Sequence, residues 1–265
     1  MDAREDLIYD VGVHNGDDTA YYLSRGYSVV GIEANLTLVE ALKTRFASEL
    51  ASGTLQLLPV GVAETSGSLD FWVCDEHTEW SSFDPNKAAL GGKTSRPVKV
   101  ETRPFASIVA EFGVPHYCKV DIEGNDQLCL DGLTPETRPD YISIELSHLT
   151  ADSDLKRMTD LGYSRFKIID QSNLTAVTQM SHAIVTALPG ALGERFDRLH
   201  GRLRGTRKRG TWRFPYGSSG PFGADLPGQW QPLETTLAIW QDIKRADEKA
   251  ASSGFGRWYD IHASL

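Results

Sequence analysis

Residues 8–35 read IYDVGVHNGDDTAYYLSRGYSVVGIEAN. The apolar runs at residues 7–11 and 28–32 are typical of short strands that are buried on both faces. Residues 17–24 lie between these runs and begin with two aspartates, which favours a helix because acidic side chains stabilise a helix N-terminus. We therefore predict a strand–helix–strand unit of a parallel α/β sheet.

The turn after the first of these strands has the features of a ligand site. Gly12 and Gly16 lack a Cβ, which would let an adenosine-sized ligand lie against the backbone. Glu33 closes the second strand, about 20 residues further on, where α/β nucleotide sites place a carboxylate for the ribose hydroxyls. The pattern predicts a nucleotide-type site at the carboxyl ends of the strands.

Two kinds of cofactor compete for this turn. A dinucleotide site needs the pattern G-x-G-x-x-G, because its pyrophosphate sits on exposed backbone N–H groups. The turn here reads DVGVHNG and lacks the third glycine, and Asp17 and Asp18 would repel a phosphate. Asp10 and Asn15 suit the ammonium and carboxylate of S-adenosylmethionine better. An NAD-linked oxidoreductase stays open as an alternative.

The strand–helix alternation continues to residue 170, and the pattern then changes. Further strands are predicted at residues 55–60, 68–73, 98–102, 117–121, 141–145 and 165–169, and helices at 36–50, 105–112, 126–130 and 154–161. Residues 171–250 are rich in loops and end in a predicted helix at 232–250, and GRWYDIHASL at 256–265 reads as a closing strand. We predict one domain over residues 1–265, in which 171–250 form a lid-like insertion.

Composition narrows the class of protein. The chain has 265 residues and a formal net charge of −9, which disfavours a general nucleic-acid binder. Three cysteines without a CxxC pair suggest buried thiols in a reducing compartment. The acidic N-terminus has no signal-peptide pattern, and no apolar run is long enough to cross a bilayer. These features predict a cytoplasmic protein with no membrane span, and they leave its oligomeric state open.

Four segments carry a resemblance to a known family. They are the opening stretch together with LLPVGVAETSGSLDFWV, YCKVDIEGND and YISIEL. Through these segments, the chain resembles the FkbM family of class I S-adenosylmethionine-dependent methyltransferases over residues 7–169. The segment KVDIEGND is similar to the Asp-x-Glu-Gly signature of that family. The resemblance implies a Rossmann-like α/β fold whose seven-strand sheet is mostly parallel with its last strand antiparallel. It also implies methyl transfer to a hydroxyl oxygen of a small acceptor, such as a sugar, a glycoside or a natural product.

The resemblance also implies a set of cofactor-binding residues. Those expected around the methionine end are Asp10, Gly12, Asn15, Gly16 and Thr19. Glu33 is expected at the ribose and Asn35 beside the adenosine. Val60, Gly61 and Val62 are expected to contact the adenine.

Four residues are candidates for the chemistry. Methyl transfer requires an aligned acceptor and a group that removes or stabilises its hydroxyl proton. Asp121 is the first choice for organising the reacting centre, and Glu123 would bind substrate hydroxyls or cap the next helix. Glu145 and His148 end the following strand, where His148 is either a general base or an ordinary surface residue. Asp121, Glu145 or Asp126 could also hold Mg²⁺, but the pattern lacks a cluster of three convincing ligands, so no metal is expected.

The insertion is basic and aromatic against an acidic background. Its basic cluster comprises Arg195, Arg198, Arg202, Arg204, Arg207, Lys208, Arg209 and Arg213, and its aromatic residues include Trp212, Phe214, Tyr216, Phe222 and Trp230. The basic residues form either a solvated loop or a lid for an acidic acceptor. The aromatic rings either stack on sugars or dock the insertion. A binding module that has lost catalysis is a further alternative.

Overall fold

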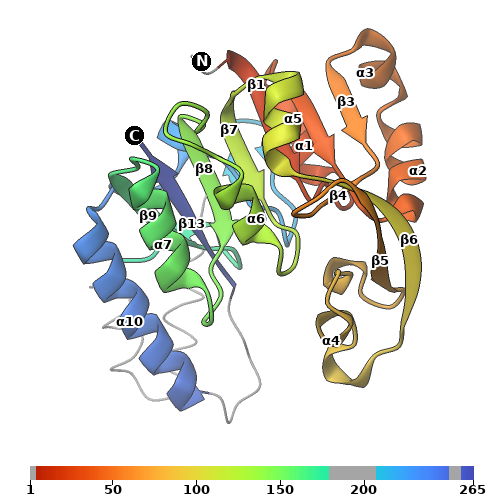
Figure 1. The fold of residues 1–265 in the computed structure, drawn as a ribbon. Helices are drawn as coiled ribbons and strands as arrows, with labels where there is room; N and C mark the ends of the chain where they lie inside the picture. Colours follow the sequence, from red (N-terminus) through yellow and green to blue (C-terminus); the bar gives the residue numbers. More distant parts are fainter. Residues whose placement is uncertain (1–3, 179–206, 251–257) are drawn as a thin grey trace. The chain divides into compact units, whose positions relative to one another are not determined.

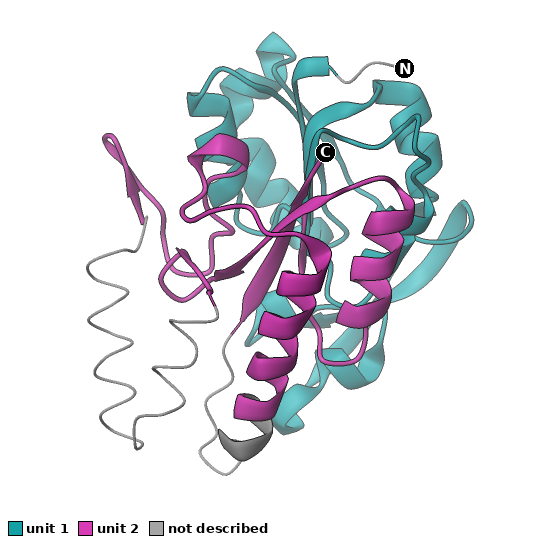
Figure 2. Cartoon of the chain, turned by 90° about the vertical axis from the view of Figure 1, so that its left-hand side faces the viewer, with its two compact units in different colours: residues 1–142 teal, residues 143–265 magenta. Residues whose placement is uncertain are grey.

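The computed structural model describes residues 4–178, 207–250 and 258–265, without the side chains of residues 247–250. The chain divides into two compact units, residues 1–142 and 143–265 (Figure 2). The predicted single-domain organisation and the lid-like role of residues 171–250 stay predictions.

The first unit is built on parallel strands. β1 (Arg4–Val11) pairs in parallel with β2 (Ser28–Ile32) on one side and with β7 (Pro115–Val120) on the other, and β2 pairs in parallel with β3 (Leu55–Leu58). The order within this unit is therefore β7-β1-β2-β3 (Figure 1). The last five residues of β1 are all buried, as expected for a central strand covered on both faces. The predicted α/β class with parallel strands is confirmed.

Helices connect these strands. They are α1 (Asp17–Ser24), α2 (Leu36–Arg45), α3 (Ala47–Ser52), α5 (Phe105–Phe112) and α6 (Asp126–Asp131). The single helix predicted at 36–50 is wrong, because the chain leaves helical geometry at Phe46, with φ −113° and ψ 30°. The strand predicted at 55–60 is also shorter, since β3 ends at Leu58.

A separate sheet accounts for the strands predicted at 68–73 and 98–102. β5 (Gly67–Cys74) and β6 (Ser95–Arg103) form an antiparallel pair, and β4 (Gly61–Val62) runs parallel to β6. The prediction of a single sheet was therefore wrong at these strands. Residues 75–94 connect β5 to β6 and are called the excursion below. They contain the short helix α4 (Pro85–Ala88) and the 3₁₀ turns η1 (Thr78–Trp80) and η2 (Leu90–Gly92) (Figure 1).

Within the described residues, the remaining elements belong to the second unit. They are β8 (Tyr141–Glu145), whose first two residues belong to the first unit, α7 (Ala151–Asp160), β9 (Arg165–Asp170), β10 (Thr175–Ala176), β11 (Lys208–Arg209), β12 (Trp212–Arg213), η3 (Gly223–Asp225), α10 (Leu233–Ala250) and β13 (Tyr259–Ser264). Its strand order is β10-β9-β13-β8. The closing strand β13 runs antiparallel to β9, as predicted. The two-residue strand β10 was not predicted and pairs with the other edge of β9.

The described part of the insertion packs by its aromatic residues. Phe214 and Phe222 are buried, which favours the docking role for these two rings, whereas Tyr216 is 67% exposed. Trp212 and Trp230 are half-buried. On β9 the buried Lys167 donates to the carbonyl oxygen of Leu226 at 3.2 Å, and its Nζ lies 4.5 Å from the centre of the Trp230 ring.

The basic cluster is only partly described. Arg195, Arg198, Arg202 and Arg204 lie outside the described residues. Arg207 donates to the carbonyl oxygen of Ser172 at 2.6 Å, and Arg209 pairs with Asp225. Lys208 and Arg213 face each other in the β11–β12 pair. Two of the four described basic residues therefore hold neighbouring segments of the chain.

Other predictions concern the thiols and the membrane. Cys74, Cys118 and Cys129 are all free and buried, as predicted. Among the described residues, none of the helices combines the length and apolar character that a membrane span requires.

Two glycines with positive φ allow a test of the turn after β1. A Cβ on Gly12 (φ +84°) would lie 1.9 Å from the carbonyl oxygen of Asp121, whereas one on Gly26 (φ +87°) would meet nothing within 4 Å. We expect Gly26→Ala to lower the free energy of unfolding by about 1 kcal/mol, the cost of left-handed backbone, and Gly12→Ala by about 3–5 kcal/mol. Urea unfolding of both variants measures the difference. Equal losses in the two variants would contradict the close approach of Gly12 to the carbonyl oxygen of Asp121.

Candidate functional site

A buried lysine joins the ends of the two central strands. Lys119 lies on β7, is 4% exposed, and donates to a carboxylate oxygen of Asp10 at 3.2 Å and to the carbonyl oxygen of Gly12 at 2.9 Å. A carboxylate oxygen of Asp121 lies 3.8 Å from its Nζ. Burial opposes the charge of Lys119, but the carboxylates of Asp10, Asp121 and Asp18 outweigh it and hold its pKa above the ordinary value.

Lys119 is not among the predicted site residues, although the sequence carries a signal for it. A lysine within the apolar run of KVDIEGND has to be paired if that run is a buried strand. The nearest carboxylate at the same sheet edge would come from the parallel neighbour β1, where Asp10 stands beside Lys119 in register.

Asp10 and Thr19 belong to this internal network. The Asp10 carboxylate is fully buried and accepts a hydrogen bond from the Thr19 hydroxyl at 2.6 Å. Both groups therefore fix the start of α1 against the end of β1. Their contact with a cofactor stays a prediction.

Gly12 and Gly16 were predicted to leave room for a ligand, but in the structure they leave room for other parts of the protein. The space beside Gly12 is filled by the Asp121 carbonyl, and a Cβ on Gly16 would lie 2.5 Å from the Phe46 ring. Both positions also have positive φ. The missing Cβ atoms thus admit the protein's own atoms. Asn15 is exposed, and its side-chain oxygen accepts from the N–H of Asp17 at 3.0 Å.

Glu33 connects the turn to the start of α2. One carboxylate oxygen accepts the His14 N–H at 2.8 Å, and the other accepts the Asn35 N–H at 2.7 Å. Burial raises the pKa of Glu33 to about 7, although the two N–H groups oppose this shift. A carboxylate has about four acceptor positions, so Glu33 retains capacity for two hydroxyl donors.

Asn35 carries an unused donor beside this carboxylate. Its side-chain oxygen caps α2 by accepting the Thr37 N–H at 3.0 Å. Its Nδ2 is buried and has no hydrogen-bond partner among the described residues. A buried donor without a partner is costly, so this edge is suited to a ligand that supplies an acceptor.

Of the three predicted adenine contacts, Gly61 and Val62 form β4 of the separate sheet, and Val60 precedes it. Val60, Gly61 and Val62 are all buried, and a Cβ on Gly61 would lie 2.2 Å from the Phe83 ring. The Asn125 side chain donates to the carbonyl oxygen of Val62 at 3.2 Å. Residues 60–62 therefore contact the protein itself, and their contact with adenine stays a prediction.

The loop after β7 presents two carboxylates. The side chains of Asp121 and Glu123 are 32% and 25% exposed. Asp126 holds this loop, because its carboxylate accepts the N–H groups of Ile122 and Gly124, both at 3.1 Å. The Glu123 side chain pairs instead with Lys87 of α4, at 3.4 Å, and the structure gives it no capping bond to α6. The sequence pattern did not indicate the contact of Lys87 with Glu123, and it offered Asp126 only as a possible Mg²⁺ ligand and not as the residue that holds this loop.

Glu145 and His148 lie in the second unit. Glu145 is the half-buried last residue of β8. The His148 ring packs edge-on against Trp240, with 5.3 Å between ring centres. Burial and the charge of Lys167 lower the pKa of His262, a buried residue of β13, to about 3.

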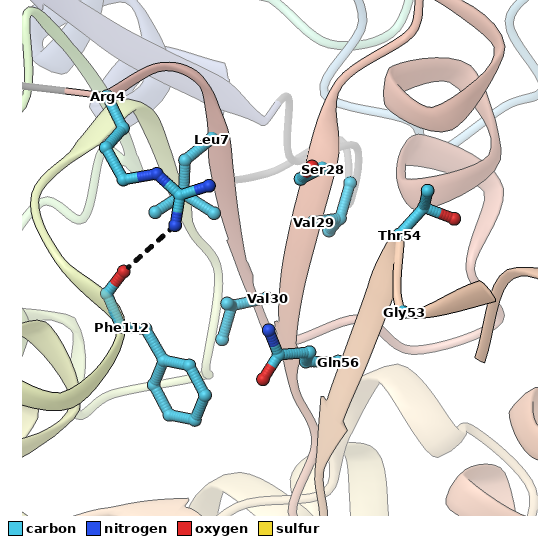
Figure 3. A pocket seen from close by; sticks show the side chains of 9 residues that line it. All are labelled: Arg4, Leu7, Ser28, Val29, Val30, Gly53, Thr54, Gln56 and Phe112. Atoms are coloured by element: carbon cyan, nitrogen blue, oxygen red, sulfur yellow. Dashed lines mark hydrogen bonds between the residues drawn. The ribbon is translucent and has the colours of Figure 1, made fainter. Parts of the chain in front are cut away.

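A small pocket lies at the opposite ends of the parallel strands (Figure 3). It is lined by residues that include Arg4, Ser28, Thr54 and Phe112, and Arg4 donates to the Phe112 carbonyl at 3.5 Å. Ser28 begins β2 and Thr54 precedes β3. The carboxylates described above follow the carboxyl ends of the strands, so this pocket is separate from them.

Comparison with known proteins adds independent findings. Residues 10–166 match the sequence model of the family described as the methyltransferase FkbM domain. A curated relative, "Probable ribosomal RNA small subunit methyltransferase A" of Methanospirillum hungatei JF-1, is 40% identical over 58 residues, which are 22% of this chain and 23% of the relative.

Among solved structures, the methyltransferase FkbM of Methylobacillus flagellatus KT is 18% identical, with a TM-score of 0.39, over 60% of this chain and 37% of that one. Phosphoethanolamine N-methyltransferase 2 of Haemonchus contortus, in complex with S-adenosyl-L-methionine, is 10% identical, with a TM-score of 0.36, over 100% and 49% of the two chains. This chain thus spans less than two thirds of the length of these relatives.

The buried pair of Asp10 and Lys119 can be tested by unfolding. We expect Lys119→Met to lower the free energy of unfolding by about 3–5 kcal/mol, because it leaves the Asp10 carboxylate buried and unpaired. The double variant Asp10→Asn with Lys119→Met should lose less than the sum of the two single losses. Lys99→Met is the control, since Lys99 pairs with Asp70 on an exposed surface and its loss should cost under about 1 kcal/mol. Additive single losses would contradict this pairing.

Proposed function

The chain belongs to the methyltransferase FkbM family, and on that premise we propose that it transfers a methyl group from S-adenosylmethionine to a hydroxyl oxygen of a small acceptor. The acceptor class we propose is a sugar, a glycoside or another hydroxylated natural product. When bound, the donor supplies a methyl carbon whose bond to a positively charged sulfur breaks as the new bond to oxygen forms.

The pairing of Glu33 with Asn35 is the observation that carries the proposal. A buried carboxylate with spare acceptor capacity suits two ribose hydroxyls, and the unpartnered Asn35 Nδ2 suits an acceptor atom of the adenosine. Both residues follow the carboxyl end of a parallel strand, where open α/β sheets bind ligands. In the proposal, the backbone of the turn between Gly12 and Gly16 adjoins the methionine end.

The same turn is poorly suited to a dinucleotide. Asp17 and Asp18 form the first turn of α1, where a pyrophosphate would need positive potential. Asp18 is also buried, so its side chain cannot turn away freely into solvent. This charge arrangement favours the proposed donor over NAD.

The remaining chemistry falls to the loop after β7. Asp121 is partly exposed and close to the Lys119 ammonium, which holds the carboxylate near the rim of the sheet. We assign it the organisation of the reacting centre, with Glu123 beside it for the acceptor hydroxyl. A cytoplasmic location belongs to the same proposal and is supported by three cysteines that are free and buried.

Cofactor binding tests the role of Glu33. We expect Glu33→Gln to weaken binding of S-adenosylhomocysteine about tenfold or more, because the amide replaces an acceptor oxygen with a donor. Wild-type affinity should fall below pH 7, where Glu33 takes up a proton, and the variant should lose this dependence. Calorimetry measures the affinity, thermal unfolding checks the fold, and exposed Glu64→Gln is the control. Tight NAD binding without any response to S-adenosylhomocysteine would refute the proposed function.

Turnover tests the role of Asp121. We expect Asp121→Asn to bind S-adenosylhomocysteine within about twofold of wild type and to lose turnover about 100-fold or more, because the organising carboxylate is lost. The assay follows release of S-adenosylhomocysteine from S-adenosylmethionine with a panel of methyl glycosides. Asp131→Asn, at the exposed end of α6, is the control. Full turnover by Asp121→Asn would remove this residue from the mechanism.

A further inference from the structure

The excursion between β5 and β6 reaches the rim of the parallel strands at three polar contacts. The Ser82 hydroxyl donates to the carbonyl oxygen of Glu123 at 2.7 Å, and the Lys87 ammonium donates to its carboxylate at 3.4 Å. The His14 Nε2 lies 2.8 Å from the Thr78 hydroxyl. Two of these contacts therefore converge on one residue, Glu123.

The backbone of Glu123 is held in an unusual conformation. Its φ is +52°, which a residue with a Cβ adopts only where its surroundings enforce it. The Ser82 hydroxyl donates to the carbonyl oxygen of Glu123. The Asp126 carboxylate accepts the N–H groups of Ile122 and Gly124, the residues before and after Glu123. The conformation is thus fixed by partners on two other elements.

Neighbouring groups also determine the pKa of the Glu123 carboxyl group. Burial, and with it the carboxylates of Asp121 and Asp126, raises the pKa of Glu123 to about 7, although the Lys87 ammonium opposes this shift. A carboxyl group with a pKa near 7 is suited to accept a proton at neutral pH. The Asp121 carboxylate faces the buried Lys119 ammonium instead, which Asp10 shares.

Lys87 reaches Glu123 across a glycine. The Lys87 stem would lie 3.3–3.5 Å from a Cβ on Gly124, so the glycine leaves room for the side chain. Asp84 fixes the start of α4 by accepting the Asn86 N–H at 2.8 Å. The Lys87 ammonium that pairs with Glu123 therefore belongs to a short helix whose N-terminus is capped by Asp84.

We propose that the excursion positions Glu123 as the base that takes the proton of the acceptor hydroxyl, with Ser82 holding its backbone and Lys87 its carboxylate. This inference rests on the proposed function. In the step, the O–H bond of the acceptor breaks, its electron pair stays on the acceptor oxygen, and the proton bonds to a Glu123 carboxylate oxygen. Ser82 and Lys87 act through Glu123 and are positioning residues.

A titration tests this coupling without any acceptor. In protein labelled with carboxyl-¹³C glutamate, the signal of Glu123 is assigned by its loss in Glu123→Gln, and its pKa is followed by NMR. We expect Lys87→Met to raise the pKa of Glu123 by about half to one pH unit, because an opposing positive charge is lost. Lys87→Arg should restore it. Lys93→Met is the matched control, because Lys93 lies in the same excursion and pairs with Glu76.

Turnover of methyl glycosides completes the test. The acid limb of kcat against pH should follow Glu123, moving to higher pH in Lys87→Met and staying in place in Lys93→Met. Ser82→Ala should lower kcat without moving the limb, since it leaves the charges intact. A limb that stays in place while the pKa of Glu123 moves would overturn the inference.

The two proposals fail in different ways. A pKa of Glu123 that Lys87→Met leaves unchanged would overturn the inference, even in an enzyme that binds S-adenosylhomocysteine and turns over. Absence of S-adenosylhomocysteine binding would instead refute the proposed function, and with it the assignment of Glu123 as a base.

Discussion

The ammonium group of Lys119 determines how the central strands of the first unit end. A charge that is 4% exposed must be paired, because its hydration is lost. Asp10 and the carbonyl of Gly12 supply that pairing, so β7 has to bring Lys119 to the point where β1 stops. Thr19 extends the same network to α1 by donating to Asp10. One buried cation thus connects two strands and the helix between β1 and β2.

The glycine turn follows from this close approach. Because β7 ends against β1, the carbonyl of Asp121 occupies the space where a Cβ on Gly12 would stand. Gly16 is pressed in the same way against Phe46. The glycines of this turn therefore indicate tight backbone packing, and the polar groups with spare hydrogen-bonding capacity are those of Glu33 and Asn35. The predicted approach of a ligand to these two glycines stays a prediction, because the space beside them is filled by the protein itself.

Sequence periodicity was sufficient to predict the bounds of an element where these depend on local features. The bounds of β2, β8, α1 and α5 are those predicted, because each has a continuous apolar run or a marked end. Periodicity was insufficient to predict contacts and helix breaks that depend on residues far apart in the sequence. The contacts of Glu123 with Lys87 and Ser82 join residues 36 and 41 positions apart, and His14 and Thr78 are 64 apart. The break at Phe46 has a similar origin, since its ring packs beside Gly16.

Burial distinguishes the two lysines of the site. Lys119 and Lys87 each pair with carboxylates of the rim, but their side chains are 5% and 39% exposed. The buried pair is screened little by solvent, so it fixes the positions of β1 and β7, and its loss affects the fold. The half-buried pair of Lys87 and Glu123 is screened more strongly, so its effect on stability is smaller and its main effect is on the proton affinity of Glu123. Because Lys119 belongs to the parallel strands and Lys87 to the excursion between β5 and β6, the group that fixes the strand ends and the group that adjusts the proposed base come from separate sheets of the first unit.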